Sequence, residues 1–387
     1  MNFVFLSPHF PPNYYQFAVH LQRLGATVLG LADEPYELLH LELRQALAEY
    51  YKVFNLHNYD ELLRALGYFT HKYGRLDRLD SHNEYWLETE ASLRTDFNIP
   101  GLKTAEIARA KRKSLMKQTF QKAGIPVARG KVVRSLAEAR RLVKETGYPL
   151  VAKPDIGVGA AKTFKINDAA KLAGFFEHKP PADYMLEEFI HGEIFTFDGL
   201  ADRDGNLVFC SSLQYSQGIM ETVNEDSLIY YYTLREIPAD LEEAGRRVLK
   251  AFEVRERFFH FEFFRAAADG RIVALEVNLR PPGGLTTDMF NYANDIDIYA
   301  EWAHVVVHNR FTAQVTRPYH CAYIGRKFNR SYACSHEHAL AELGPRLVHH
   351  EPISGVFAQA LGEYGYLVRS PDLDEIHAMA ALIQQTA

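Results

Sequence analysis

Residues 258–284 constrain the fold of this chain more than any other stretch. An aromatic run (Phe258–Ala266) and a β-branched and aliphatic run (Arg271–Leu279) flank an Asp-Gly pair. Two runs of this composition around Asp-Gly predict a β-hairpin. We expect a three-residue loop, Ala268–Gly270, with its glycine in the left-handed conformation and residue 267 paired with residue 271.

This register brings acidic side chains together. Successive strand residues face opposite ways, which predicts Val273, Leu275, Val277 and Leu279 on one face and Ile272, Ala274, Glu276, Asn278 and Arg280 on the other. A three-residue loop places Glu262 directly opposite Glu276, whereas a two-residue loop would put them on opposite faces. Two carboxylates and an amide oxygen at close range need a cation, and such hard ligands suit Mg²⁺ or Mn²⁺. Glu262, Glu276 and Asn278 are therefore the predicted metal ligands.

The second strand ends in Arg280-Pro-Pro-Gly-Gly284. Prolines and glycines force an irregular turn with exposed backbone, and exposed N–H groups can bind an anion. The alternative is a solvated hairpin face, which usually carries Lys, Thr or Ser and does not end in this way. We therefore favour a functional site over a solvated face.

The composition indicates a globular protein of two or three subdomains, because 387 residues exceed one small core and 47% are hydrophobic against 24% charged. A net charge of −6 without a block of like charge does not favour nucleic acid or membranes as partners. The odd number of cysteines without CxxC spacing fits a reduced cytoplasm. No basic leader or spanning apolar run is seen, so a cytoplasmic location is expected.

The chain begins with an α/β unit, in which strands Asn2–Leu6 and Thr27–Leu31 flank a loop and a helix. The GxGxxG fingerprint is absent, which gives a dinucleotide fold little support. Asn98–Gly101 (NIPG) is a strong break. The predicted division is an N-terminal parallel α/β domain (1–101), a middle domain (102–312, with a mobile lid at about 125–185) and a small C-terminal α/β subdomain (313–387).

A possible phosphate flap lies in the middle domain. A helix is expected over Lys103–Ala123, ended by Gly-Ile-Pro. Further along, strand Pro149–Lys153 ends in a lysine, a loop rich in small residues follows, and another strand begins at Phe164. Backbone amides in such a loop can close over phosphates. A plain hairpin is the alternative, and the preceding lysine favours the flap. After the central hairpin, Thr287–His308 is expected to be helical.

Taken in order, these elements resemble the ATP-grasp superfamily, and look closest to its carboxylate–amine ligases and its carbamoyl-phosphate-synthase-like members. The ordered set consists of Lys113, Lys153 with its following glycine-rich flap, the run Glu187-Glu188-Phe189-Ile190 with Glu193, then Glu262, and Glu276-x-Asn278-x-Arg280-x-x-Gly283-Gly284. It covers roughly residues 102–310. The resemblance implies an α/β and α+β multidomain protein in which two α+β subdomains clasp ATP.

The resemblance also implies a role for each matching residue. Lys113 and Lys153 would hold the phosphates beneath the flap, which includes Gly157, Gly159 and Lys162. Glu187, Glu188, Phe189 and Ile190 would form the adenine hinge, and Glu193 would accept hydrogen bonds from the ribose. Glu262, Glu276 and Asn278 would bind Mg²⁺ (or Mn²⁺), while Arg280 and Lys153 would act in catalysis. Gly283, Gly284 and Glu84 would contact substrate. The family often has serine in the flap, where this chain has Ala160 and Ala161.

Three functions follow from the resemblance. The favoured one is an ATP-dependent ligase that activates a carboxylate as an acyl phosphate and couples it to an amine or thiol. The second is an enzyme that phosphorylates bicarbonate or formate. The third is an ATP-binding regulatory protein without turnover, against which the arginine at the phosphoryl site argues. Small-molecule carboxylate and amine substrates, ATP and Mg²⁺ are the expected ligands, and a homodimer is possible. The sequence names neither substrate.

Overall fold

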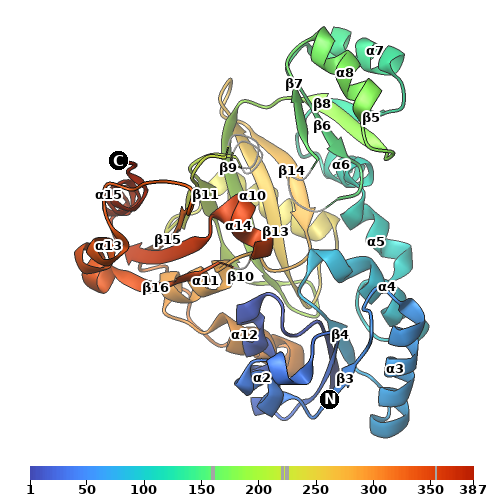
Figure 1. The fold of residues 1–387 in the computed structure, drawn as a ribbon. Coiled ribbons are helices and arrows are strands. Elements are labelled where there is room, and N and C mark those ends of the chain that lie inside the picture. Colours follow the sequence, from blue (N-terminus) through green and yellow to red (C-terminus); the bar gives the residue numbers. More distant parts are fainter. Residues whose placement is uncertain (158–161, 219–221, 223–225, 354) are drawn as a thin grey trace.

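The computed structural model describes residues 1–157, 162–218, 222, 226–353 and 355–387. It is a mixed α/β structure of several parts, as the sequence predicts (Figure 1). The N-terminal elements lie at the bottom of Figure 1, a small lid lies at the upper right, and the C-terminal elements lie at the left. No helix in the described ranges is long and apolar enough to cross a membrane.

The N-terminal region is a parallel sheet of four strands in the order β3-β2-β1-β4. Its strands are β1 (Asn2–Leu6), β2 (Thr27–Ala32), β3 (Glu49–Lys52) and β4 (Arg78–Asp80). Its helices are α1 (Tyr15–Arg23), α2 (Leu41–Ala46), α3 (Tyr59–Tyr73) and α4 (Leu87–Asp96). The expected α/β unit is thereby confirmed, and β1 and β2 are almost wholly buried, as parallel strands between helices usually are.

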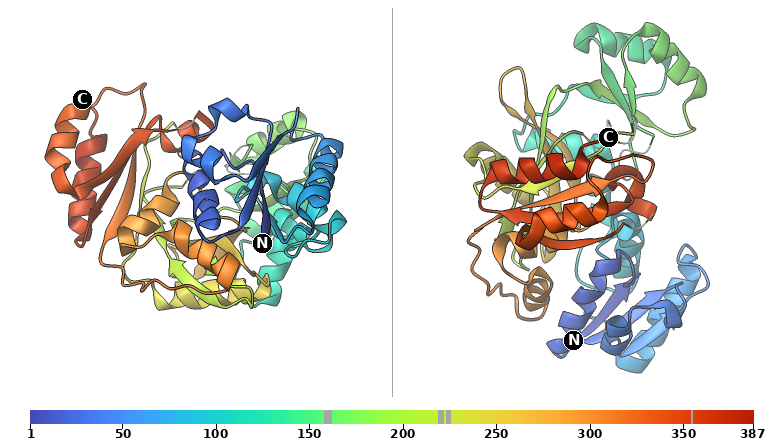
Figure 2. Two further views of the ribbon diagram at one scale, coloured as in Figure 1. Left: turned by 90° about the horizontal axis from the view of Figure 1, so that it is seen from below. Right: turned by 60° about the vertical axis from the view of Figure 1, so that its left-hand side comes forward.

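The lid is a separate antiparallel sheet in the order β5-β8-β6-β7 with two helices. Its elements are β5 (Gly130–Val133), α7 (Leu136–Thr146), β6 (Leu150–Pro154), β7 (Phe164–Ile166), α8 (Ala169–His178) and β8 (Tyr184–Glu188). It has its own small hydrophobic core, which includes Leu142, Leu150 and Leu186. Figure 2 shows the lid standing apart from the other regions.

Two helices, α5 (Thr104–Lys111) and α6 (Lys113–Lys122), lead to the lid. The expectation of one continuous helix over Lys103–Ala123 is therefore wrong. The chain is extended at Arg112, and Asp155 binds the start of α6: its carbonyl accepts from Lys113 N and its carboxylate from Ser114 N, both at 2.8 Å. An acceptor supplied from the lid thus ends one helix and begins the next.

The central sheet has nine strands, and the path β14-β13-β9-β11-β12-β15-β17-β16 connects eight of them, with β10 paired to β9. Before the central hairpin come β9 (Gly192–Ala201), β10 (Leu207–Ser211), β11 (Leu213–Tyr215), β12 (Tyr230–Thr233) and α10 (Ala239–Ala251). The hairpin is β13 (Arg257–Ala266) and β14 (Ile272–Asn278). After it come α11 (Thr286–Asn294) and α12 (Ile298–His308), so Thr287–His308 is helical as expected except at residues 295–297, where the chain turns through left-handed Asp295.

The C-terminal elements extend this central sheet. They are β15 (His320–Arg326), α13 (His336–Leu343), β16 (Leu347–Pro352), α14 (Gly355–Leu361), β17 (Tyr364–Ser370) and α15 (Leu373–Gln384). Strand β15 pairs with β12, so hydrogen bonds cross the boundary proposed at residue 312. The three-part division of the chain remains a prediction.

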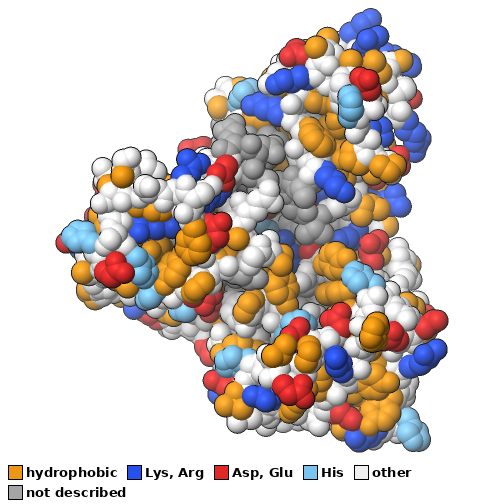
Figure 3. All heavy atoms as spheres, viewed as in Figure 1, with side chains coloured by type: hydrophobic (Ala, Val, Ile, Leu, Met, Phe, Trp, Pro, Cys, Tyr) orange, Lys and Arg blue, Asp and Glu red, His pale blue; other side chains and the backbone are white. Residues whose placement is uncertain are grey.

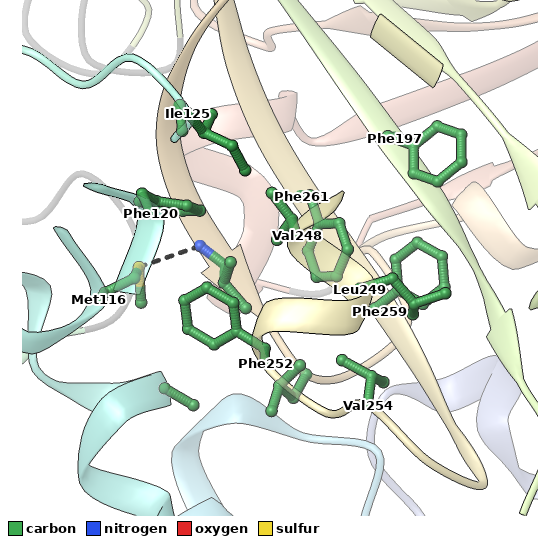
Figure 4. Packing of buried hydrophobic residues seen from close by; sticks show 14 of the residues in the cluster. Met116, Phe120, Ile125, Phe197, Val248, Leu249, Phe252, Val254, Phe259 and Phe261 are labelled. Carbon is green, nitrogen blue, oxygen red and sulfur yellow. Dashed lines mark hydrogen bonds between the residues drawn. The ribbon is translucent and has the colours of Figure 1, made fainter. Parts of the chain in front are cut away.

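Helices α6 and α10 pack beside the central hairpin and hold it in place (Figure 4). Phe120 of α6 and Phe252 pack against each other, with ring centroids 5.4 Å apart. Met116 Sδ accepts a hydrogen bond from Val277 N at 3.1 Å. The edge strand β14 is therefore covered by α6, whose first residue, Lys113, points to the candidate site described next.

Candidate functional site

The register of the central hairpin is the foundation of the site. Glu262 of β13 pairs with Glu276 of β14, as predicted. The loop differs from the expectation: Ala266 N donates to Arg271 O, leaving a loop of residues 267–270, and a bulge beside Glu262 restores the predicted pairing. Gly270 has a φ of +73°, which confirms its left-handed conformation.

The bulge changes which side chains share a face, so the predicted strict alternation is wrong. Ile272 and Ala274 join Val277 and Leu279 in the hydrophobic core, whereas Leu275 lies outside that core and lines a cavity that Ala274 also borders. Glu276, Asn278 and Arg280 line the same cavity, together with Glu262. An extra residue in one strand reverses the alternation beyond it. The bulge thus lets an apolar and an acidic neighbour face the cavity together.

The predicted metal ligands are engaged by cations of the protein. Lys113 Nζ lies 2.7 Å from Glu276 Oε1, and His260 Nε2 lies 3.0 Å from Glu262 Oε1. The described residues contain no cluster of three or more His, Cys, Asp or Glu arranged to hold a metal. Two carboxylates and the amide of Asn278 are nevertheless hard oxygen donors that fit Mg²⁺. The lysine and the histidine beside these carboxylates indicate that this face of the hairpin favours positive charge.

A buried chain of polar groups lies behind Glu262. His260 Nδ1 is 2.6 Å from Asp198 Oδ1, and Asp198 Oδ2 accepts from Thr196 Oγ1 at 2.6 Å. Burial disfavours the imidazolium, but the carboxylates of Asp198 and Glu262 outweigh it and raise the pKa of His260 to about 9. Burial would raise the pKa of Glu262, but the hydrogen bond from His260 lowers it overall. The contact with Asp198 orients the His260 ring, and the ring in turn holds Glu262.

Lys153, the penultimate residue of β6, meets an anion, as a buried lysine in an apolar strand requires. Lys153 Nζ is 2.5 Å from Glu187 Oε1, and Lys117 Nζ is 2.7 Å from Glu187 Oε2. All three side chains are largely buried. Burial lowers the pKa of Lys117, while the two lysines outweigh the effect of burial and lower that of Glu187. Glu187 thus joins helix α6 to two strands of the lid.

The flap is only partly described. Gly157 O accepts from Lys113 Nζ at 3.2 Å, so the start of the flap lies near the carboxylate of Glu276 in β14. Lys162 is exposed and has a φ of +60°. Gly159, Ala160 and Ala161 lie outside the described residues. The flap connects β6 to β7, and these two strands pair as an antiparallel hairpin.

The predicted adenine hinge lines one end of the cavity with Glu187, Glu188, Phe189, Ile190 and Glu193. Phe189 N donates to Pro149 O at 3.1 Å, which ties the segment between β8 and β9 to the lid. Lys165 Nζ lies 3.9 Å from the centre of the Phe189 ring. An aromatic ring and apolar neighbours can hold a flat base in this position.

The other end of the cavity lies beyond Arg280. Gly283 and Gly284 line it together with Tyr215, Tyr231 and helix α14. Arg280 Nη1 donates to Pro281 O at 2.8 Å, which fixes one end of its guanidinium. Gly284 has a φ of +63°, a conformation that favours glycine. The whole cavity has a volume of about 780 Å³. Figure 3 shows the surface indented between the lid and the C-terminal elements.

Glu84 is not among the residues that line this cavity. It is buried, and Lys111 Nζ pairs with its Oε1 at 3.0 Å. Its Oε2 has no hydrogen-bond partner within the described residues. Burial raises its pKa, and the charges of Arg280 and Glu276 also reach it. The substrate contact expected of Glu84 therefore remains a prediction.

Sequence reasoning missed Lys117, Asp198, His260 and helix α14. The first lies one helical turn after Lys113, on the same face of α6, which is the only sequence signal for it. His260 interrupts a run of phenylalanines two residues before Glu262. Strand periodicity puts these two polar residues on the same face, which is the sequence signal for His260. Asp198 pairs with it from 62 residues away, and no local pattern reveals such a contact.

Comparison with known proteins agrees with this geometry. Residues 146–288 match the family model described as ATP-grasp domain. This segment contains the lid strands β6 to β8 and the whole central hairpin. The chain therefore contains an ATP-grasp domain, as its ordered motifs indicated.

Named relatives are ligases and synthases. The L-arginine-specific L-amino acid ligase of Bacillus subtilis is 26% identical over 248 residues, which cover 61% of this chain and 59% of that protein. The carbamoyl phosphate synthase large chain of Thermotoga maritima is 26% identical over 188 residues, 46% of this chain and 17% of that protein. The chain thus matches less than two thirds of the length of either relative.

Among solved structures, the L-amino acid ligase from Bacillus licheniformis has a TM-score of 0.76 at 15% identity. The match covers 100% of this chain and 97% of that one. At this identity the likeness establishes the fold. It extends to the N-terminal sheet and to the C-terminal strands, both of which lie outside the segment that matches the family model.

Proposed function

We propose that this protein is an ATP-dependent ligase that activates a substrate carboxylate as an acyl phosphate and couples it to an amine or thiol, releasing ADP and phosphate. One observation carries the proposal: a single cavity contains the carboxylates of the hairpin, two lysines for phosphates and, beside them, Arg280 followed by Gly283-Gly284. Phosphoryl transfer needs this kind of positioning and charge neutralisation rather than a protein nucleophile.

In the first step a substrate carboxylate oxygen attacks the γ-phosphorus of ATP in line, and the bond from that phosphorus to the β,γ-bridging oxygen breaks. ADP leaves with the electron pair, and an acyl phosphate remains. Lys113 and Lys153 would hold the phosphates, and Arg280 would neutralise charge on the transferred group. Mg²⁺ held by Glu262, Glu276 and Asn278 would supply further neutralisation of the phosphate charge.

In the second step the amine attacks the acyl carbon, the carbon–oxygen bond to phosphate breaks, and the amine loses its proton. The amides of Gly283 and Gly284 lie beside Arg280, where they would stabilise the oxyanion of the tetrahedral intermediate. Lys113 and Lys153 each pair with a glutamate in the structure. When phosphates bind, both lysines would leave these glutamates. The adenine would lie against Phe189 and Ile190, with its ribose near Glu193.

Carboxylate-dependent ADP formation tests the proposal. The purified chain is incubated with Mg-ATP, hydroxylamine and individual carboxylic acids, because hydroxylamine converts an acyl phosphate to a stable hydroxamate. We expect ADP and hydroxamate in equal amounts. ADP formation with bicarbonate or formate alone would support the second candidate instead. ATP binding without any ADP formation would support the regulatory protein.

A further inference from the structure

Helix α14 is more apolar than its burial explains. Its sequence, GVFAQAL, carries no charge, yet only Leu361 is buried and Val356 is 73% exposed. Val356, Phe357, Ala360 and Leu361 line the cavity of the candidate site. An exposed apolar surface that lines a cavity commonly binds an apolar ligand.

This helix lies directly over the two glycines that follow Arg280. A Cβ atom added to Gly283 would lie 3.4 Å from the ring of Phe357, and one added to Gly284 would lie 2.7 Å from Leu361. Phe10 stacks on Phe357 from the N-terminal region, with ring centroids 5.6 Å apart and an interplanar angle of 9°. Phe357 is therefore held in place at the end of the cavity beyond Arg280, which is the acceptor end in the proposed reaction.

A neighbouring part of the wall is also aromatic. Tyr215 and Tyr231 line the cavity, and their rings are stacked with centroids 5.0 Å apart. Tyr231 OH would lie 3.6 Å from a Cβ atom on Gly284, so this pair and α14 meet at the same glycine. A flat or branched apolar group fits between such walls, because aromatic rings offer large contact areas.

Charge is distributed unevenly along the cavity. Of its described lining residues, those from α14, from 215–218 and from Tyr231 are all uncharged, and the charged lining residues beside them are Arg280 and Glu262, the latter already paired with His260. A second charged group on the substrate would find no opposite charge in this described part of the wall, which makes its burial costly.

We infer that the carboxylate substrate is a monocarboxylic acid with an uncharged aromatic or branched apolar side group, and that Phe357 determines this specificity. The inference rests on the proposed ligase function. The carboxylate lies towards Arg280, where phosphoryl transfer takes place. The side group lies between Phe357 and the Tyr215–Tyr231 pair.

Hydroxamate formation with matched acids tests the inference. The probes are phenylalanine, leucine, glutamate and arginine, each paired with the corresponding acid that lacks the α-amine. We expect kcat/KM for the phenylalanine and leucine types to exceed that for the glutamate and arginine types by at least about tenfold, since a hydrophobic pocket discriminates to this degree. A higher kcat/KM for any acid with a charged side group overturns the inference.

Variants of α14 sharpen the test. Phe357→Asp should lower kcat/KM for the phenylalanine type by about 10- to 100-fold and raise that for the arginine type. Phe357→Leu should retain activation of the leucine type. Ala358→Asp is the matched control, because Ala358 does not belong to the cavity lining, and it should preserve the ranking of the acids. An unchanged ranking in folded Phe357→Asp overturns the role of Phe357.

Failure of the ligase function and failure of the proposed specificity give different results. If no acid gives hydroxamate although the protein binds Mg-ATP, the ligase function is wrong and the specificity falls with it. If hydroxamate forms only from acids with charged side groups, the ligase function stands and the inference about the substrate is wrong.

Discussion

The two ends of the cavity differ in whether their side chains have partners within the protein. The nucleotide end, named after the proposed function, is the part around Lys113, Lys153 and Glu187, and the acceptor end is the part beyond Arg280. At the nucleotide end, every buried charge described above has a partner within the protein: Lys113 pairs with Glu276, His260 with Glu262, and Lys117 and Lys153 share Glu187. At the acceptor end, apolar side chains of α14 lie exposed without such partners. A charge cannot be left unpaired in a buried site, whereas an apolar surface tolerates water.

This difference indicates which interactions each end of the cavity loses and gains when its ligand binds. In the proposed mechanism the nucleotide end trades internal ion pairs for contacts with phosphates and metal, so its affinity is a difference between two large electrostatic terms. The acceptor end gains by covering apolar surface, a smaller and less directional contribution. Variants at the charged end should therefore have the larger effects on turnover.

The largest effect is expected at the junction of the two ends. Arg280→Ala should depress kcat by on the order of 10²-fold or more while Mg-ATP binding stays nearly intact, because the arginine acts on charge that develops in the transition state. Steady-state kinetics and calorimetry separate the two quantities. Arg271→Ala, at the exposed hairpin turn, is the control. Equal losses of kcat and nucleotide affinity would place Arg280 in ground-state binding.

Two buried histidines extend the comparison to stability. His82 lies among aromatic rings such as Phe17 and Trp302, and burial lowers its pKa from 6.5 to about 4. The unfolded chain therefore takes up a proton that the folded chain excludes. The free energy of unfolding should fall by on the order of 3 kcal/mol as the pH drops from about 6.5 to 4.

His260 has the opposite sign. Its pKa is raised to about 9, so its contribution to stability is complete below 6.5 and is lost as the pH rises through about 9. The two histidines thus act in separate pH ranges. Urea unfolding at pH 7 and pH 5 measures the first effect, with His82→Asn as the variant, since asparagine tolerates the φ of +56° at this position. An equal pH dependence in His82→Asn would exclude His82 as the source.

The metal ligands give the next effect. Glu276→Gln keeps the shape of the side chain but removes one negative charge, so it should raise the Mg²⁺ concentration for half-maximal turnover by roughly tenfold. ATP binding without metal should change much less. Titration of Mg²⁺ at saturating ATP measures the shift. Normal turnover at limiting Mg²⁺ would show that the metal is bound elsewhere.

The smallest effects separate two lysines that share one carboxylate. Lys153→Met should lower ATP affinity by at least about tenfold, because it removes a charge-assisted phosphate contact. The fold should survive, since Lys117 still neutralises Glu187. Lys117→Met should cost only about threefold, by leaving Lys153 held more firmly on Glu187. Calorimetry orders the two, and a larger loss in Lys117→Met would reverse their roles.

The residues of the nucleotide end could be predicted from the sequence far better than those of the acceptor end. Glu262, Glu276, Asn278 and Arg280 sit on one hairpin, so strand periodicity and an Asp-Gly turn sufficed to bring them together. The predicted pairing of Glu262 with Glu276 was right although the predicted loop length was wrong, because a bulge compensates for the longer loop. Bulges depend on tertiary packing, which local patterns do not contain.

The acceptor end could not be predicted because its parts are distant in the chain. Phe10, Tyr215, Gly283 and Phe357 meet only through the central sheet and the N-terminal region. The break at Arg112 has the same origin, since the acceptor that starts α6 is Asp155 in the lid. Contacts of this kind carry no periodic signal in the sequence.

The central claim is that a carboxylate oxygen attacks the γ-phosphorus of ATP at this site. The most direct measurement uses an accepted carboxylic acid labelled with a heavy oxygen isotope in its carboxylate, with mass spectrometry of the phosphate released during coupling to the amine. Because phosphate leaves from the acyl phosphate with the bridging oxygen, the account predicts one labelled oxygen in each phosphate. Unlabelled phosphate, or release of AMP and pyrophosphate, would contradict it.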